Sequence, residues 1–211
     1  MENFSNQNNV ENQAEDSIIE NKKFNWRREL FDWIQAIAVA LVVSFLLKNY
    51  VLTLAKVQGQ SMEPTLKHED RLYVNRLMYE PKKGDVIIFR PGSDPDRPYI
   101  KRIIATEGDT LYINFVSGDV YVNDEKIDEP YINEETHLMG SYIESLMRNG
   151  EYSRENPIVI EKDKMFVMGD NRNASKDSRE IGQVPEDEII GHAIFRFWPV
   201  NKVTALDYEA E

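Results

Sequence analysis

An apolar run near the N-terminus divides this chain into two unlike parts. Residues 33–47 (WIQAIAVALVVSFLL) are apolar on every side of a helix, not along one stripe. Such a helix is buried in a protein core or in a membrane. Continuing to Leu54 supplies the roughly 20 residues that a bilayer needs, with Lys48 reaching the interface. We therefore expect one transmembrane helix over residues 29–54; the alternative is a core helix of a soluble domain.

The residues before this run predict its orientation. Residues 1–21 are polar, Asn-rich and acidic, without Lys or Arg, which is typical of a disordered tail. Basic residues then precede the span: Lys22, Lys23, Arg27 and Arg28. Because basic residues favour the cytoplasmic side, residues 1–28 should be a disordered cytoplasmic tail with a basic flank. The chain after the span should lie on the outer side of the cell membrane.

A cleaved secretory signal is the competing interpretation of the same run. Residues 53–55 (TLA) offer the small residues that a cleavage site requires. The leader would be unusually long, however, and its first third is acidic. We prefer an uncleaved anchor in a single-pass protein.

Composition excludes several classes of function. The 211 residues contain 25 Lys and Arg against 37 Asp and Glu, a net charge of -12, which disfavours binding to nucleic acid phosphates. There is no cysteine, so thiol catalysis, disulfides and Cys-ligated zinc are excluded. The three histidines lie far apart in the sequence, and we expect neither a metal site nor a cofactor.

Beyond the apolar run the pattern changes to short strands with close turns. Residues 71–76, 86–90 and 99–106 alternate or form short apolar runs, separated by Gly, Pro and Asp. This pattern predicts a mainly β, antiparallel domain over residues 55–200, followed by a C-terminal tail over 201–211. Residues 129–164 are more polar, contain two prolines and suit an insertion with a short helix over 142–147.

Ser61 is a candidate nucleophile in a glycine- and proline-bearing stretch, residues 57–66. A serine hydroxyl is weak at neutral pH and needs a base. Taken alone this is weak evidence, because serines in such stretches are usually turn residues.

Lys101 is the candidate base. In an alternating strand it shares a face with Tyr99 and Ile103. A lysine that faces an apolar interior has a lowered pKa and can act as a general base. The alternative is a solvated lysine on an edge strand.

A polar segment over residues 168–179 could hold such an amine in place through hydrogen bonds and ion pairs. The alternatives are an ordinary polar turn or a loose cation site using Asp170, Asn171 and Asp177. The spacing does not match an EF-hand.

Three motifs, in this order after the apolar run, resemble those of the type I signal peptidases. They are Ser61-Met62-x-Pro64-Thr65-Leu66, Tyr99-Ile100-Lys101-Arg102 and Gly169-Asp170-Asn171-Arg172-x-x-Ser175-x-Asp177-Ser178-Arg179. The resemblance covers residues 31–198. It implies a membrane-anchored antiparallel β-sheet catalytic domain, and a serine endopeptidase that removes signal peptides from exported preproteins after a small-x-small motif.

The resemblance also implies residue roles. Ser61 is the nucleophile, Lys101 the general base, and Ser175 the hydroxyl that orients the lysine. Asp170 with Arg102, and Asp177 with Arg179, form supporting ion pairs. The Ser61 N–H is one oxyanion donor. Gly59 stands where some members carry a second, hydroxyl donor, so the chain resembles the Gram-positive branch.

The substrate and its surroundings follow from the same comparison. Five residues could line shallow apolar pockets for small side chains: Val57, Met62, Leu66, Tyr99 and Ile100. The partners implied are signal peptides and membrane lipid, with the secretion translocon nearby. Two rival functions remain open: a Ser/Lys autoprotease of SOS-repressor type, and a non-catalytic membrane-anchored β-domain that binds exported peptides.

Overall fold

The structure is a computed structural model that describes residues 26–46, 52–77 and 79–206. The chain forms two compact units, Met1–Phe45 and Leu46–Glu211. The predicted tail over residues 1–21 and the first two basic residues, 22 and 23, lie outside the described ranges.

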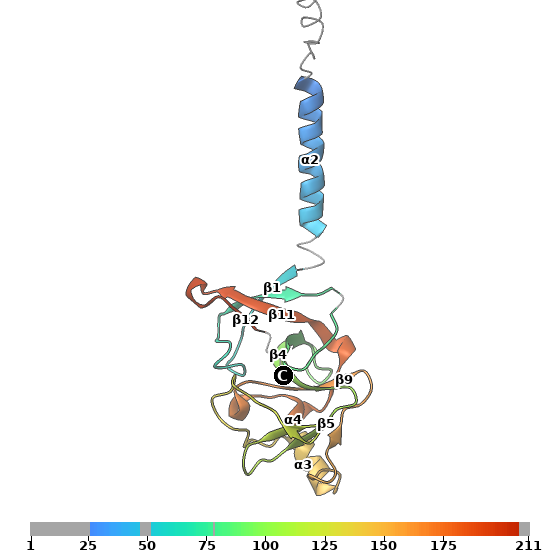
Figure 1. Cartoon of the computed structure of the whole chain (residues 1–211), viewed down its shortest axis with the longest axis vertical. Coiled ribbons are helices and arrows are strands. Elements are labelled where there is room, and N and C mark those ends of the chain that lie inside the picture. The colour runs from blue at the N-terminus through green and yellow to red at the C-terminus, as the bar shows by residue number, and fades with distance from the viewer. Residues whose placement is uncertain (1–25, 47–51, 78, 207–211) are drawn as a thin grey trace, which may run out of the picture. The chain divides into compact units, whose positions relative to one another are not determined.

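Helix α2 (Trp26–Leu46) is the described part of the first unit (Figure 1). Bulky apolar side chains all around it are exposed: Trp26, Leu30, Phe31, Trp33, Ile34, Ile37, Val39, Leu41, Val42, Val43 and Phe45. Within the described ranges, no helix is both long enough and apolar enough to cross a membrane.

The bounds of the expected span, residues 29–54, need correction at both ends. Helix α2 begins three residues earlier, at Trp26. The last part of the expected span belongs to strand β1 (Leu52–Lys56), which pairs antiparallel with β2 (Arg71–Asn75). The β-ladder pairs the backbone of these residues, so they do not continue the helix.

The second unit is built around an eight-stranded sheet, and every pair in it is antiparallel, as predicted. Its strand order is β1-β2-β11-β3-β4-β9-β10, and β12 pairs with β11. The remaining strands of this sheet are β3 (Val86–Phe89), β4 (Tyr99–Thr106), β9 (Lys164–Met168), β10 (Val184–Pro185), β11 (Ile189–Trp198) and β12 (Thr204–Ala205).

Alternation along β3 shows how this sheet builds a core on each face. All four residues of the strand are buried. Val86 and Ile88 pack into one apolar cluster, whereas Ile87 and Phe89 pack into another. Successive side chains of a strand point to opposite faces, so the sheet is covered on both sides where β3 and β4 run.

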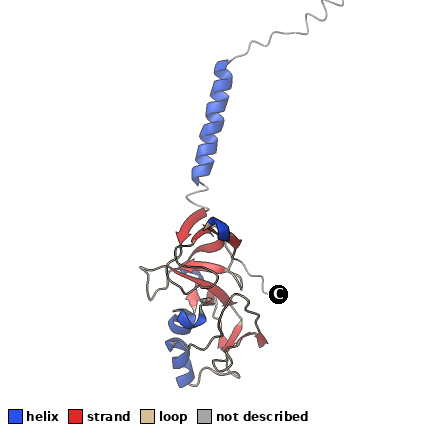
Figure 2. Ribbon diagram, turned by 90° about the vertical axis from the view of Figure 1, so that its left-hand side faces the viewer, coloured by secondary structure: helices blue, strands red, loops and turns tan. Residues whose placement is uncertain are grey.

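A smaller sheet of four strands (Figures 1 and 2) shares a third apolar cluster with β4 and β9 of the larger sheet. Its order is β7-β6-β5-β8, formed by β5 (Thr110–Ile113), β6 (Val120–Val122), β7 (Glu125–Lys126) and β8 (Ile158–Val159). Helix α3 (Ser141–Arg148) buries Ile143 against this core, which confirms the short helix expected over 142–147.

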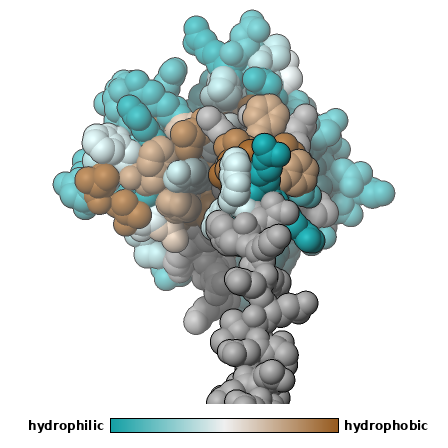
Figure 3. Space-filling model, turned by 90° about the horizontal axis from the view of Figure 1, so that it is seen from above, coloured by the Kyte–Doolittle hydropathy of each residue, from teal (hydrophilic) through white to brown (hydrophobic). Residues whose placement is uncertain are grey.

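The segment expected to be an insertion, residues 129–164, is part of this third cluster. It supplies both α3 and β8, and it buries Ile143, Tyr152, Ile158 and Ile160 there. The predicted C-terminal tail over 201–211 likewise begins as structure, because Thr204 and Ala205 pair with β11. Apolar side chains also reach the surface near that end, among them Trp198, Val200 and Val203; brown apolar residues interrupt the polar surface in Figure 3.

Candidate active site

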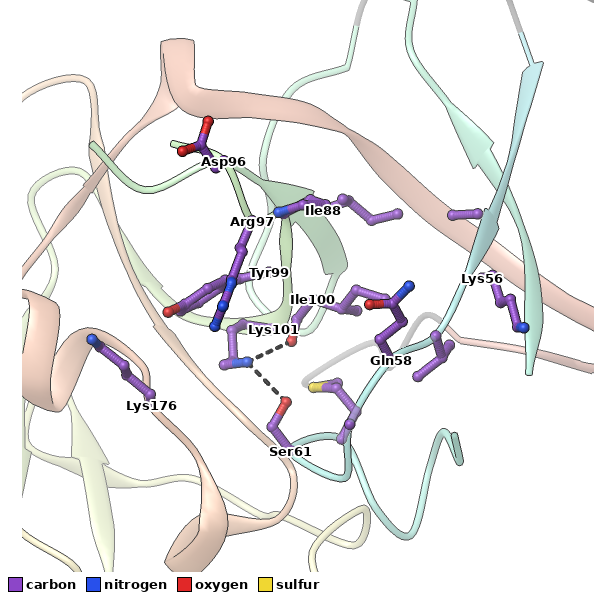
Figure 4. A pocket seen from close by; sticks show the side chains of 15 residues that line it. Lys56, Gln58, Ser61, Ile88, Asp96, Arg97, Tyr99, Ile100, Lys101 and Lys176 are labelled. Atoms are coloured by element: carbon purple, nitrogen blue, oxygen red, sulfur yellow. Dashed lines mark hydrogen bonds between the residues drawn. The ribbon is translucent and has the colours of Figure 1, made fainter. Parts of the chain in front are cut away.

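Ser61 lies in a series of tight turns between β1 and β2. Gly59, just before it, has φ +90°, a conformation that glycine adopts without strain. The chain then coils: the Glu63 N–H donates to the Gln60 carbonyl at 3.0 Å, and the Leu66 N–H donates to the Met62 carbonyl at 2.8 Å. These turns hold the serine beside strand β4 (Figure 4).

The Lys101 amine reaches this serine from β4. Its Nζ lies 2.9 Å from Ser61 Oγ, and it also donates to the Ile100 carbonyl at 3.0 Å. Lys101 is only 4% exposed. Tyr99 and Ile103, predicted to share its face, pack into one apolar cluster, so the surroundings of the amine are mainly apolar.

Burial lowers the pKa of Lys101 to about 8. Burial is the main cause because an apolar environment disfavours the charged form of an amine. The negative charges of Asp177 and Asp170 oppose this by raising the pKa, and the Arg179 charge lowers it. At pH 7 about a tenth of the amine is therefore neutral and able to act as a base, far more than in a free lysine.

Two buried ion pairs occupy the nearby carboxylates. Arg102 Nε and Nη2 donate to Asp170 at 3.0 and 2.8 Å, and Arg179 Nε and Nη2 donate to Asp177 at 2.8 and 2.8 Å. All four side chains are almost completely buried. Bidentate pairing of this kind fixes both partners and directs the carboxylates towards arginine instead of Lys101.

Ser175 is close to the pair but does not bond to the amine. Its hydroxyl is buried and, among the described residues, has no hydrogen-bond partner. The contact with Lys101 that the resemblance implies is therefore not formed in this structure. A Cβ added at Gly169 would overlap both Ser175 Oγ and the Ser61 carbonyl oxygen, which explains why glycine occupies this position.

A third buried arginine links the same motif to residues that the sequence analysis did not single out. Arg172 donates to the Gly169 carbonyl at 3.1 Å, to Thr136 Oγ1 at 2.9 Å and to the Glu129 carboxylate. The ring of Tyr131 lies 4.1 Å from Arg102 Cζ. The segment around residues 129–136 thus braces the motif. No local pattern in its sequence indicates this, because the partners are about 36 to 43 residues apart.

A pocket of about 730 Å³ opens beside Ser61 and Lys101 (Figure 4). Four of the five residues predicted to bind substrate line it: Val57, Met62, Tyr99 and Ile100. The fifth, Leu66, does not. It is fully buried in the core cluster with Leu72 and Val74, because the turn from Met62 carries it inward.

The other residues of the pocket wall were not anticipated from the sequence. They are Ala55, Lys56, Gln58, Gly59, Ile88, Asp96, Arg97, Pro98 and Lys176. Most of them are adjacent in the sequence to a predicted motif, and this adjacency was the one signal that could have identified them. Ile88 is not adjacent to a motif; its strand β3 reaches the pocket because it pairs with β4.

A serine hydroxyl within hydrogen-bonding distance of a buried lysine amine is the arrangement of a serine protease that uses lysine as its base. Comparison with known proteins agrees with that class. Residues 30–198 match the family described as "Signal peptidase, peptidase S26". The chain therefore belongs to the signal peptidase family of serine endopeptidases.

Two relatives of similar sequence support this assignment. Signal peptidase IB of Staphylococcus aureus (strain Mu50) is 40% identical over 182 residues, covering 83% of this chain and 93% of the relative. Signal peptidase I of Bacillus licheniformis is 33% identical over 197 residues, covering 90% and 100%. A crystal structure of a signal peptidase I from Enterococcus faecalis V583 aligns with 54% of this chain and 97% of its own, at 24% identity and a TM-score of 0.36.

Proposed function

We propose that this chain is a membrane-bound serine endopeptidase that cleaves N-terminal signal peptides from exported preproteins after a small-x-small motif. The observation that carries the proposal is the 2.9 Å contact between Ser61 Oγ and Lys101 Nζ at the wall of a pocket. The family membership and the named relatives support the choice of substrate.

The reaction begins with proton transfer from Ser61 to the neutral Lys101 amine. Ser61 Oγ attacks the carbonyl carbon of the second small residue, and the carbonyl electron pair moves to oxygen. The resulting ammonium then gives its proton to the departing amine, which leaves an acyl-enzyme. Lys101 next takes a proton from water, whose oxygen attacks the ester carbon. The ammonium then returns the proton to Ser61 Oγ as the ester bond breaks, which releases the acid product and restores the neutral amine.

The oxyanion is stabilised by the Ser61 N–H, a contribution worth a few kcal/mol per donor. Gly59 provides no side-chain donor. Its N–H donates instead to His68 Nδ1 at 3.2 Å, so it is already engaged and does not serve as the second donor.

An extended substrate can pair with the edge of the chain that leads to Ser61. The Val57 N–H and carbonyl bond to Asp70 and Glu69 on one side, at 2.8 and 3.0 Å. The main-chain groups of Gln58 therefore point to the other side, where the pocket lies. Strand addition gives affinity and the apolar walls admit small side chains, because methylene discrimination alone contributes only about 1–3 kcal/mol.

We further propose that helix α2 (Trp26–Leu46) anchors the enzyme in the cell membrane, with the residues before it cytoplasmic and the β-domain outside. The exposed apolar side chains around α2 and the basic residues before it support this orientation. In that position the site would meet signal peptides near the translocon and beside membrane lipid.

One assay tests the activity: cleavage of a preprotein by the wild type and by Ser61→Ala. We expect cleavage at the small-x-small site by the wild type and none by the variant. Binding without cleavage would favour the peptide-binding alternative, and self-cleavage without processing of the preprotein would favour the autoprotease. External protease on spheroplasts should digest the β-domain and spare the first 28 residues; protection of the β-domain would reverse the topology.

A further inference from the structure

The pocket wall carries the opposite charge to the chain as a whole. The chain has 25 basic against 37 acidic residues. Among the pocket residues, however, four are basic, Lys56, Arg97, Lys101 and Lys176, and one, Asp96, is acidic. Like-signed charges gathered in a cleft create a local potential that attracts ligands of the other sign.

The four cations differ in whether a carboxylate already neutralises them. Lys56 Nζ lies 2.5 Å from Glu69 Oε2, a close ion pair. Lys101 is buried beside Ser61 and is used as the base. Lys176 has only a long contact of 3.6 Å with Glu180. Such exposed pairs contribute little, so Lys176 is still able to attract another anion.

Arg97 is the cation of the pocket with the most unused capacity. Its guanidinium makes no ion pair or hydrogen bond with any residue in the described ranges, and it is exposed. Five N–H donors in a rigid fork match the two oxygens of a carboxylate. Figure 4 shows the Arg97 side chain directed into the pocket, running beside Tyr99.

Lys176 lies across Tyr99 from the nucleophile loop and also lines the pocket. Its charge acts on Tyr99: burial raises the pKa of that phenol, Lys176 opposes the rise, and the carboxylates of Asp94 and Glu180 add to it. Two cations from separate segments, the loop before β4 and the segment after β9, thus line the same pocket.

We propose that Arg97 and Lys176 form a subsite for an acidic side chain of the substrate. The enzyme then prefers preproteins that carry Asp or Glu within a few residues of the scissile bond. This subsite rests on the proposed function, because it assigns a substrate feature to the same pocket. Anionic lipid headgroups are the less suitable ligand, since both cations line the pocket that contains Ser61.

The test uses matched peptides that share one small-x-small core. Asp, Asn or Lys is placed in turn at each of the five positions on either side of the scissile bond, except the two small positions of the core, and kcat/KM is measured at low salt and at high salt. At one or two positions we expect Asp to be cleaved about 3- to 10-fold faster than Asn at low salt, and Lys more slowly than Asn. High salt should remove most of the difference.

Variants assign the preference to the two residues. In the double variant Arg97→Gln, Lys176→Gln, the ratio of kcat/KM for the Asp peptide to that for the Asn peptide should fall to about one. In Arg97→Glu the order should reverse, so that the Lys peptide is cleaved faster than the Asp peptide. Lys162→Gln is the matched control, because Lys162 is 79% exposed and does not line the pocket. It should keep the wild-type ratio.

The outcomes separate this subsite from the proposed activity. Cleavage of the Asn peptide by the wild type but not by Ser61→Ala would uphold the activity whatever the charge preference. Equal rates for Asp and Asn at every position, or a preference that survives the double variant, would overturn the subsite. A charge effect that appears only with vesicles containing anionic lipid would also overturn it and assign the two cations to the membrane surface.

Discussion

The two sheets of the β-domain treat charge in opposite ways. The four-stranded sheet packs Leu111, Ile113, Val120 and Val122 with α3 into an apolar cluster. The eight-stranded sheet buries Lys101 and Arg102 side by side on β4. A buried charge is costly unless it is paired. The four-stranded sheet thus contributes stability through apolar packing. The eight-stranded sheet instead bears the free-energy cost of buried charges at the candidate active site.

Within the larger sheet, the adjacent residues Lys101 and Arg102 differ in whether a carboxylate pairs with the buried charge. Arg102 is satisfied by the Asp170 carboxylate and the Gly84 carbonyl. Among the described residues, the hydrogen bonds of the Lys101 amine go to neutral oxygens, those of Ser61 and Ile100. The arginine therefore stays charged and structural, whereas the unpaired lysine can lose its proton.

The largest expected effect comes from removing the reacting pair. Ser61→Ala and Lys101→Met should each lower kcat/KM by about 10⁴-fold or more, and the double variant should be no worse than either, because the two residues act as one unit. Cleavage rates on a preprotein measure this. The unfolding midpoint of Lys101→Met should stay equal or rise, since the lowered pKa of the amine costs stability below pH 8, and that cost fades only towards pH 10.5.

The four-stranded sheet should respond in stability alone. Leu111→Ala removes a fully buried side chain and should lower the free energy of unfolding by about 2–5 kcal/mol. Denaturant titration measures the loss. The pH dependence of kcat/KM should be unchanged, and a shifted pH profile would show that the two sheets are not independent in the way described.

Gly169→Ala should lower kcat through a steric effect at the candidate active site. The new methyl group would overlap Ser175 and the Ser61 carbonyl, and displacing a nucleophile by about 1 Å costs roughly 10²-fold in rate. Steady-state kinetics should show the loss in kcat. Gly92→Ala is the matched control, because its Cβ meets only the end of the flexible Glu188 side chain; comparable loss there would argue against a steric effect at the nucleophile.

The smallest effect expected is a change in pH dependence. Because the neutral amine is the active form, kcat/KM should rise with pH through about 8. Removing the Arg179 charge in Arg179→Gln should move this limb to higher pH, and Asp177→Asn should move it to lower pH, by about 0.5 to 1 unit each. Limbs that move in the same direction would exclude this electrostatic account.

The antiparallel domain and the proximity of Ser61 and Lys101 could be predicted from the sequence for clear physical reasons. Strands of period two with close turns show up locally, and the motifs around Ser61 and Lys101 are dense. The prediction that Leu66 lines the pocket was wrong, because an apolar residue in a motif can lie equally well in a pocket or in a core. The turn closed by the hydrogen bond from its N–H to the Met62 carbonyl directs its side chain into the core cluster, and the sequence alone does not reveal that turn.

Contacts between distant segments could not be predicted in this way. Residues 52–56 are apolar enough for either a helix or a strand, and pairing with β2 decides between them. Tyr152 appeared to be an ordinary residue of a polar segment. Its hydroxyl in fact bonds to the N–H and carbonyl of Ile113, which joins the supposed insertion to the third cluster.

The open edge that leads to Ser61 has a consequence for the enzyme in concentrated solution. Within the described residues β1 is the last strand of its sheet, and an unpaired edge accepts any extended chain. A second copy presents the same edge. Lys56, at the end of β1, puts a charge there, which discourages such pairing without closing the edge. At high enzyme concentration, association between copies should compete with substrate, so activity per molecule should fall as the enzyme is concentrated.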